Sequence, residues 1–185
     1  MKKVTIFVLA FLLSTLSYAQ EFMGVSISGN KSDCVAKFTA KGFKYKKEVG
    51  NTVVMEGKLQ SQNVDLFITS TPTSKQVWKF TVYYPEETSW FGIKGSYKDL
   101  KETLTEKYGK PESYEYFSKP YEEGDGYETT AIKIEKCSYS SFWRADNLIV
   151  ALEISKYMQL KLSYESQTGV SKRDEEQSKI DKNTF

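Results

Sequence analysis

Long stretches of the chain alternate apolar and polar side chains with a period of two residues, and this pattern constrains the fold more than any other feature. Successive side chains of a strand point to opposite sides, so each stretch predicts a β-strand with one apolar and one polar face. Strands of this kind form antiparallel sheets with one face in water. The stretches lie at 53–59, 64–69, 78–84, 132–135, 148–154 and 158–164.

Two short amphipathic segments interrupt the strands and predict helices. The first begins at Ser32, a good N-cap residue, and ends at Gly42, whereas the second begins at Ser96 and ends at Gly109 with Pro111 behind it. Short helices are marginal alone in water, so we expect both to pack on the sheet. Their apolar faces consist of Cys34, Val35 and Phe38 in the first helix, and of Tyr97, Leu100, Leu104 and Tyr108 in the second.

The order strand, helix, several strands occurs twice. The stretch "FMGVSISG" precedes the first predicted helix and "SWFGIKGS" precedes the second, and Cys34 and Phe38 correspond to Leu100 and Leu104. The sequence therefore predicts one α+β domain over 20–165. We expect a tandem repeat of a short helix plus an antiparallel β-meander (about 20–88 and 89–165), with the helices packed on one face of the sheet.

Three stretches carry a resemblance to known proteins. They are "FMGVSISGNKSDCVAKFTAKGFKY", "KYGKPE" and "IVALEISKYMQLKLSYE". Over most of Phe22 to Glu165 the chain resembles a group of bacterial secreted proteins, whose layout is similar to the β-lactamase-inhibitor-protein-like fold of two side-by-side helix-plus-sheet repeats. The resemblance implies this fold. It implies no activity and no inhibitory residues, because its motifs are packing and turn signals and nothing matches an inhibitor loop.

The first nineteen residues predict an export signal. Lys2 and Lys3 form a basic start, Val4 to Leu16 an apolar core of thirteen residues, and Ser17 to Ala19 a small-residue cleavage site. Thirteen apolar residues are too few for a membrane span, which needs about 20. We therefore expect cleavage after Ala19 and a periplasmic or secreted protein without a membrane span.

Removal of the signal makes the chain formally neutral. Two of the 26 Lys and Arg residues lie in the signal, which leaves 24 against 24 Asp and Glu. A neutral surface with both signs interspersed does not attract phosphate backbones or anionic lipid. We therefore expect no nucleic acid partner.

The chain contains no histidine, and this excludes several classes of chemistry. It removes the commonest general base and every Ser-His or Cys-His nucleophile pair. Catalysis would then depend on carboxylates alone, as in glycoside hydrolysis, for which Glu115, Glu122, Glu123 and Asp125 are the candidates. Nothing in the sequence pairs any two of them or buries one. We expect no catalytic residue, no cofactor and no enzymatic activity.

The segment "PYEEGDGYE" at 120–128 concentrates carboxylates around two glycines. Glu122, Glu123, Asp125 and Glu128 do not have the spacing of a calcium hand. The Asp125-Gly126 pair is typical of a turn. We expect a solvated turn without a metal, and a weak calcium site is the alternative.

Cys34 and Cys137 are the two cysteines of the chain, and export permits a disulfide between them. A bridge would close a loop of about 100 residues and contribute up to ~4.7 kcal/mol in the chain-entropy model. The alternative is two separately buried thiols that pack as small hydrophobes. The sequence favours the bridge, although it does not show whether the two Cα atoms come within about 7 Å.

Aromatic residues gather around two loops, in "YYPEETSWF" at 83–91 and "SYEYFSKPY" at 113–121. Tyr and Trp provide large contact area at low conformational cost, so these loops predict a binding site. The predicted binding residues are Tyr83, Tyr84, Trp90, Phe91, Tyr114, Tyr116 and Tyr121. We expect a non-catalytic binding module for a protein in the cell envelope, or alternatively a carbohydrate-binding module. Simple packing of Trp78, Trp90 and Trp143 is the competing interpretation.

The last twenty residues, 166–185, differ in character. They hold eight charges, with Val170, Ile180 and Phe185 as their sizeable apolar residues. Such a segment cannot bury enough apolar surface to fold alone. We expect a charged, flexible tail rather than a short helix at 173–181.

Overall fold

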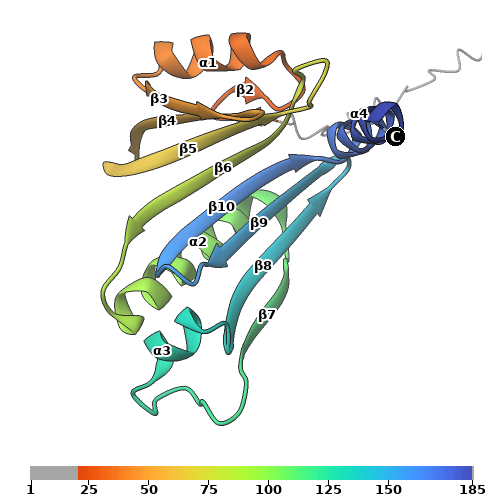
Figure 1. The fold of residues 1–185 in the computed structure, drawn as a ribbon. Coiled ribbons are helices and arrows are strands. Elements are labelled where there is room, and N and C mark those ends of the chain that lie inside the picture. The colour runs from red at the N-terminus through yellow and green to blue at the C-terminus, as the bar shows by residue number, and fades with distance from the viewer. Residues whose placement is uncertain (1–20, 185) are drawn as a thin grey trace, which may run out of the picture.

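The structure is a computed structural model that describes residues 21–184, so the predicted signal at 1–19 lies outside the described residues. Four helices and an eight-stranded antiparallel sheet form an α+β fold (Figure 1), which confirms the predicted fold class. The elements are β1 (Glu21–Phe22), β2 (Val25–Ser26), α1 (Lys31–Ala40), β3 (Lys44–Val49), β4 (Thr52–Leu59), β5 (Gln62–Ser70), β6 (Val77–Glu86), α2 (Trp90–Tyr108), β7 (Glu112–Phe117), α3 (Glu128–Lys133), β8 (Cys137–Ala145), β9 (Leu148–Ile154), β10 (Gln159–Ser166) and α4 (Gln167–Thr184).

The sheet consists of two four-stranded meanders joined through their last strands. The strand order is β3-β4-β5-β6-β10-β9-β8-β7, so α1 precedes one meander and α2 precedes the other. Strands β6 and β10 pair antiparallel at the junction, with Phe80 opposite Tyr164 and Tyr83 opposite Lys161. The second meander therefore runs through the sheet in the reverse order of the first. This arrangement is the predicted tandem helix-plus-meander repeat, with α3 inserted between β7 and β8.

One face of the sheet is apolar and carries both α1 and α2. Directly opposed residues of antiparallel strands point to the same side. On the helix side such a row runs through Val53, Ile68, Phe80, Tyr164, Val150 and Trp143, all of them buried. The ring of Phe38 in α1 packs edge-on against Phe80 at 5.2 Å, and the ring of Tyr97 in α2 packs against Tyr139 of β8 at 5.6 Å. The core therefore lies between the two helices and this face.

The helix starts differ from those predicted. Asn30 caps α1, because its Oδ1 accepts a hydrogen bond from Ser32 N at 3.0 Å. Ser89 caps α2 by accepting from Gly92 N at 3.1 Å, so this helix begins six residues before the predicted Ser96. Two glycines, at positions 92 and 95, weaken the helical pattern of that first part, and packing of buried Ile93 stabilises it instead.

The predicted strand at 132–135 is wrong, because this segment ends a helix. Residues Glu128–Lys133 form α3, in which Ile132 is buried. Ile134 follows the last residue of the helix and is half exposed. Two isoleucines at a spacing of two fit a strand, but so short a run does not distinguish a strand from a buried helix.

The C-terminal segment forms a helix rather than the expected flexible tail. Helix α4 begins directly after β10 and packs on β6 and β10 at the end of the sheet (Figure 1). Its Gly169 lies against Trp78, where a Cβ atom would come within 2.6 Å of the Trp78 Cβ. One turn further on, the Arg173 guanidinium stacks over the Trp78 ring at 4.5 Å. The docking surface for this polar helix comes from β6, distant in the sequence, so local composition did not reveal it.

Glu176 fixes α4 to the turn between β5 and β6. Its carboxylate accepts hydrogen bonds from Thr73 N at 2.8 Å, Ser74 N at 3.1 Å and Ser74 Oγ at 2.6 Å. The Ser74 hydroxyl, followed by the backbone N–H groups, lowers the pKa of this carboxyl from 4.5 to about 2. The ionised form is thus the one that holds the helix.

No helix among residues 21–184 has the combination of length and apolar character that crossing a membrane requires.

We predict that α4 detaches at acidic pH. A carboxylate whose pKa is lowered in the folded state stabilises that state fully above its ordinary pKa of 4.5, and this contribution is lost as the pH falls toward about 2. Hydrogen exchange of the α4 amides, corrected for intrinsic rates, should therefore become faster between about pH 6 and about pH 3. The variant Glu176→Ala should show fast exchange already at neutral pH.

The control is Glu175→Ala, because Glu175 accepts a hydrogen bond from Lys179 of its own helix, at 2.5 Å. Equal exchange in the two variants, or protection of α4 that is independent of pH, would contradict the assigned role of Glu176.

Candidate functional site

The face of the sheet opposite α1 and α2, here called the open face, carries polar and aromatic side chains. In Figure 1 the β8 to β10 part of this face is turned toward the viewer, with α2 behind it. Register pairs connect one row of directly opposed residues across all eight strands, from β3 to β7. This open-face row consists of Lys44, Glu56, Asp65, Tyr83, Lys161, Glu153, Ser140 and Tyr114.

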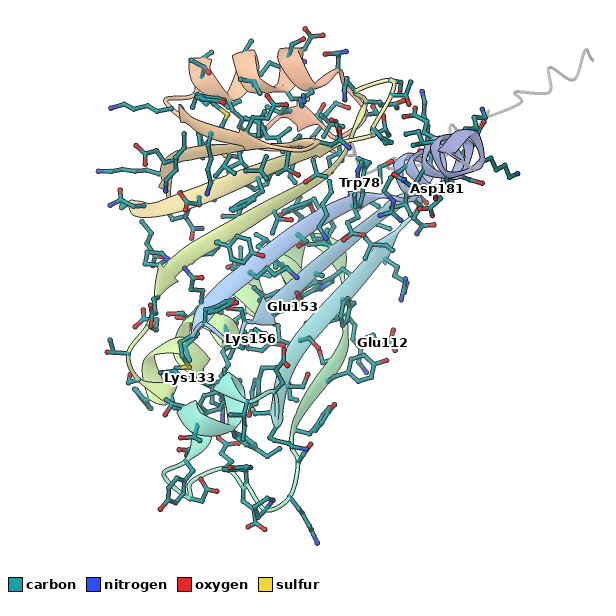
Figure 2. All side chains as sticks on the ribbon, viewed as in Figure 1. Trp78, Glu112, Lys133, Glu153, Lys156 and Asp181 are labelled. Carbon is teal, nitrogen blue, oxygen red and sulfur yellow. The ribbon has the colours of Figure 1, made fainter. Side chains whose placement is uncertain are left out.

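Ion pairs connect different strands on the open face. Lys46 Nζ donates to Asp65 Oδ1 at 3.0 Å, and Lys161 Nζ donates to Glu153 Oε2 at 2.6 Å. Figure 2 labels Glu153 on β9. Burial lowers the pKa of Lys161, but the hydrogen bond and charge of Glu153 outweigh it, so this pKa stays above its usual value. The Lys161 ammonium group therefore keeps its charge at neutral pH.

Two aromatic pairs flank the centre of the open face. The rings of Phe67 and Tyr83 meet edge-on at 5.2 Å, and those of Tyr114 and Phe142 do so at 6.1 Å. Strands lie about 4.8 Å apart, so Tyr83 on β6 and Tyr114 on β7 are separated by roughly 19 Å. Edge-on packing holds each ring in place without a helix above it.

The open face is concave. The next row along the strands contains Val54, Thr81 and Ser163, which are 2%, 6% and 2% exposed although neither α1 nor α2 lies on this side. The twist of the sheet and the longer side chains around them, such as Phe67 and Tyr83, cover these positions.

Two hollows meet at Tyr83, and each is lined by residues from both faces of the sheet. The larger, of about 840 Å³, lies at the ends of β3 to β6 and is lined by lysines, Glu56, Asp65, Tyr83 and Tyr84. The smaller, of about 320 Å³, is lined by Tyr83, Cys137, Ser140, Glu153 and Lys161, among others. Tyr83 therefore stands between the two spaces in the middle of the sheet. A further hollow, of about 530 Å³, lies along α2 on the helix side and includes Glu115.

The structure divides the predicted binding residues between the two faces. Tyr83, Tyr114 and Tyr116 share the open face, where Tyr114 is 46% and Tyr116 55% exposed. Tyr84, at the adjacent position to Tyr83, faces the helix side and is 7% exposed.

The remaining predicted residues lie elsewhere. Trp90 at the start of α2 packs edge-on against Phe117 at 5.5 Å and Tyr139 at 5.0 Å. Phe91 is 90% exposed on the same helix, and Tyr121 is half-buried in the loop after β7. The predicted loops thus contribute the end of β6 and the edge strand β7 to the open face, but not one continuous aromatic patch.

Sequence reasoning missed Phe67, Phe142, Lys161 and Glu153. A signal for Phe67 was present, because the alternation in 64–69 places it on the polar side together with Asp65. A large ring at a polar position of an amphipathic strand marks a solvent-facing aromatic. The pairing of Lys161 with Glu153 required the register of β9 and β10.

Three of the four candidate catalytic carboxylates, those of Glu115, Glu123 and Asp125, have separate structural partners. Glu115 Oε1 accepts from Tyr97 Oη at 3.2 Å and from Lys101 Nζ at 2.6 Å. Glu123 forms an ion pair with Lys94 and accepts from Tyr139 Oη at 3.3 Å. These contacts stabilise α2 and β7 against β8, and they do not bring the acids to one space.

The acidic loop at 120–128 is a turn held by its own carboxylates. Asp125 accepts from Glu122 N at 2.9 Å and from Tyr127 N at 2.7 Å, and Glu128 Oε1 accepts from Gly124 N at 2.8 Å. In the part of the chain that the structure describes, three or more metal-ligating side chains do not gather anywhere.

The expected Cys34–Cys137 disulfide is not present, and both residues are free thiols. Cys34 lies in α1, which packs on β2, β3 and β5, and its Sγ contacts Ser26 O at 3.6 Å. Cys137 begins β8 opposite Phe117, in the other meander. Five strands separate β3 from β8 in the sheet, so the two thiols belong to different ends of it.

Comparison with known proteins identified no relative of the chain. No family model matches the chain, and the searches of curated proteins and of solved structures gave no match. The resemblance to the β-lactamase-inhibitor-protein-like fold therefore rests on the sequence motifs and the repeat order.

We predict that both thiols resist alkylation in the folded protein and react after unfolding. Burial raises the pKa of the Cys34 thiol to about 11 and that of Cys137 to about 12, so little thiolate forms near pH 8. Mass spectrometry after iodoacetamide treatment without reductant should show almost no adduct on the native chain and two adducts in denaturant. An unfolded chain that takes up no adduct before reduction would instead establish the disulfide.

Proposed function

We propose that this protein is a non-catalytic binding module that holds a protein partner on the open face of its sheet. The observation that carries the proposal is Tyr83, a half-buried aromatic in the middle of the open face, with a hollow on either side of it.

The composition of the open face supports a protein partner. Tyrosine is frequent among the residues that dominate binding energy, and such residues lie near the centre of an interface with polar groups around them. Here Tyr83 and Phe67 are central, and the ion pairs Lys161–Glu153 and Lys79–Glu165 lie beside them. The row across eight strands spans seven spacings, or roughly 34 Å, which is ample for a typical interface of about 800 Å² per partner.

The side chains of this face are also ordered before binding. Phe67 holds the Tyr83 ring, Phe142 holds the Tyr114 ring, and Glu153 holds the Lys161 side chain. Ordering a free side chain on binding costs about 0.5–1.5 kcal/mol, and a preformed surface avoids much of this.

The acids of the open face support binding rather than catalysis. Asp65 and Glu153 each lie within hydrogen-bond distance of a lysine, so each is a neutralised partner in an ion pair. Location in the cell envelope rests on the signal predicted at 1–19.

We predict that Tyr83→Ala weakens partner capture at least tenfold, as expected when an aromatic at the centre of an interface is truncated. Crosslinking pull-down from envelope extracts, quantified by mass spectrometry against the unchanged chain, measures the effect. The double variant Tyr114→Ala/Tyr116→Ala tests the second aromatic region in the same way. Circular dichroism confirms that each variant is folded.

Phe91→Ala is the matched control, because Phe91 is an exposed aromatic of α2 outside the open face. The proposal requires that a captured protein is lost with Tyr83→Ala and kept with Phe91→Ala. The reverse pattern would move the site to α2. Binding on a glycan array that Tyr83→Ala abolishes, without protein capture, would make the protein a carbohydrate-binding module instead.

A further inference from the structure

The larger of the two hollows beside Tyr83 is lined by more positive than negative side chains. Here called the lysine hollow, it occupies about 840 Å³ at the ends of strands β3 to β6. Its charged lining consists of Lys41, Lys44, Lys46 and Lys58 against Glu56 and Asp65. Four ammonium groups and two carboxylates leave a formal surplus of two positive charges, although the mature chain as a whole is neutral.

The positive charge is unevenly distributed around the hollow, because both carboxylates lie next to the same lysine. Lys46 Nζ lies 3.0 Å from Asp65 Oδ1 and 4.0 Å from Glu56 Oε2. Lys41, Lys44 and Lys58 are exposed and take part in none of the ion pairs found among residues 21–184. Three ammonium groups around one concave space attract anionic groups from solution.

A buried tyrosine also lines this space. Tyr84, from the helix side of the sheet, lines the lysine hollow and is 7% exposed. Burial raises the pKa of Tyr84, so it adds no negative charge to the hollow at neutral pH. Gln159 also lines the hollow, and its Nε2 donates a hydrogen bond to Tyr84 O at 3.1 Å.

The edge of the sheet beside the hollow favours an extended peptide as the ligand. Strand β3 pairs with β4 on one side and is the end of the sheet on the other, and all six of its residues are exposed. Its unpaired backbone groups can take up a further strand. The lysines of this edge oppose pairing with a basic or apolar strand, but they attract an acidic one.

We propose that the lysine hollow and the edge of β3 receive an acidic, extended segment of the protein partner. This inference rests on the proposed function and names the chemistry of that partner: closely spaced Asp and Glu side chains. A carboxylate in the hollow meets Lys44 and Lys58 while the peptide backbone lies along β3. An acidic glycan offers the same carboxylates, but it cannot pair with the backbone of β3.

The test measures binding of a fluorescein-labelled octaglutamate peptide to the full chain by fluorescence polarisation, with octaglutamine as the uncharged comparison. Octaglutamate should bind and octaglutamine should not. Raising the salt from about 0.02 M to about 0.5 M should weaken binding strongly, because the Debye length falls well below the width of the hollow.

The variant Lys44→Gln/Lys58→Gln should weaken octaglutamate binding about fivefold, since each exposed ion pair contributes a factor of roughly 1.5 to 5. The matched control is Lys98→Gln/Lys110→Gln, which removes two exposed lysines in and after α2. Absence of octaglutamate binding, or an equal loss in both double variants, would overturn the inference. Preference for an oligogalacturonate over octaglutamate would overturn the assignment to a peptide.

This experiment separates the two proposals. If octaglutamate fails to bind while Tyr83→Ala still abolishes capture of an envelope protein, only the acidic segment is refuted. If no protein is captured but octaglutamate binding depends on Lys44 and Lys58, the hollow is an acid-binding site and the proposed partner class is refuted.

Discussion

The pairing of β6 with β10 is the constraint on which the rest of the structure depends. Each meander ends with one of these strands, and their antiparallel ladder joins the two halves into one sheet. The register sets Phe80 opposite Tyr164 on the helix side and Tyr83 opposite Lys161 on the open side. A slip of one residue would exchange the faces of a strand, which would place Tyr83 in the core and Phe80 in solvent.

Helices α1 and α2 lie on one side of this sheet, so neither of them covers the other side. Its stability comes from edge-on aromatic pairs and cross-strand ion pairs, such as Phe67 with Tyr83 and Lys161 with Glu153. Such pairs contribute modestly one by one, but they also fix the positions of side chains that solvent can reach. The same interactions order the surface that we propose binds a partner. The proposed preference for an acidic segment rests on the lysines that stay unpaired beside it.

How much was predictable differs from element to element. The strands at 64–69, 78–84, 148–154 and 158–164 were predictable, because a period of two is a local property of the sequence. The strand predicted at 132–135 was wrong and α4 was missed, because Ile132 and Trp78 decide these elements through contacts distant in the sequence. In the candidate site, Tyr83, Tyr114 and Tyr116 were predicted, whereas their charged neighbours depend on register and were not.

The sequence by itself determined which stretches form amphipathic strands, that two helices pack on them, and that histidine-dependent chemistry is absent, because these follow from residue type and spacing. Only the tertiary structure decided that Tyr83 and Tyr114 share a row while Tyr84 faces the helix side, that Cys34 and Cys137 lie in different meanders, and that three lysines meet around one hollow. Strand order and register bring together residues far apart in the chain, and alternation within a strand does not specify either of them.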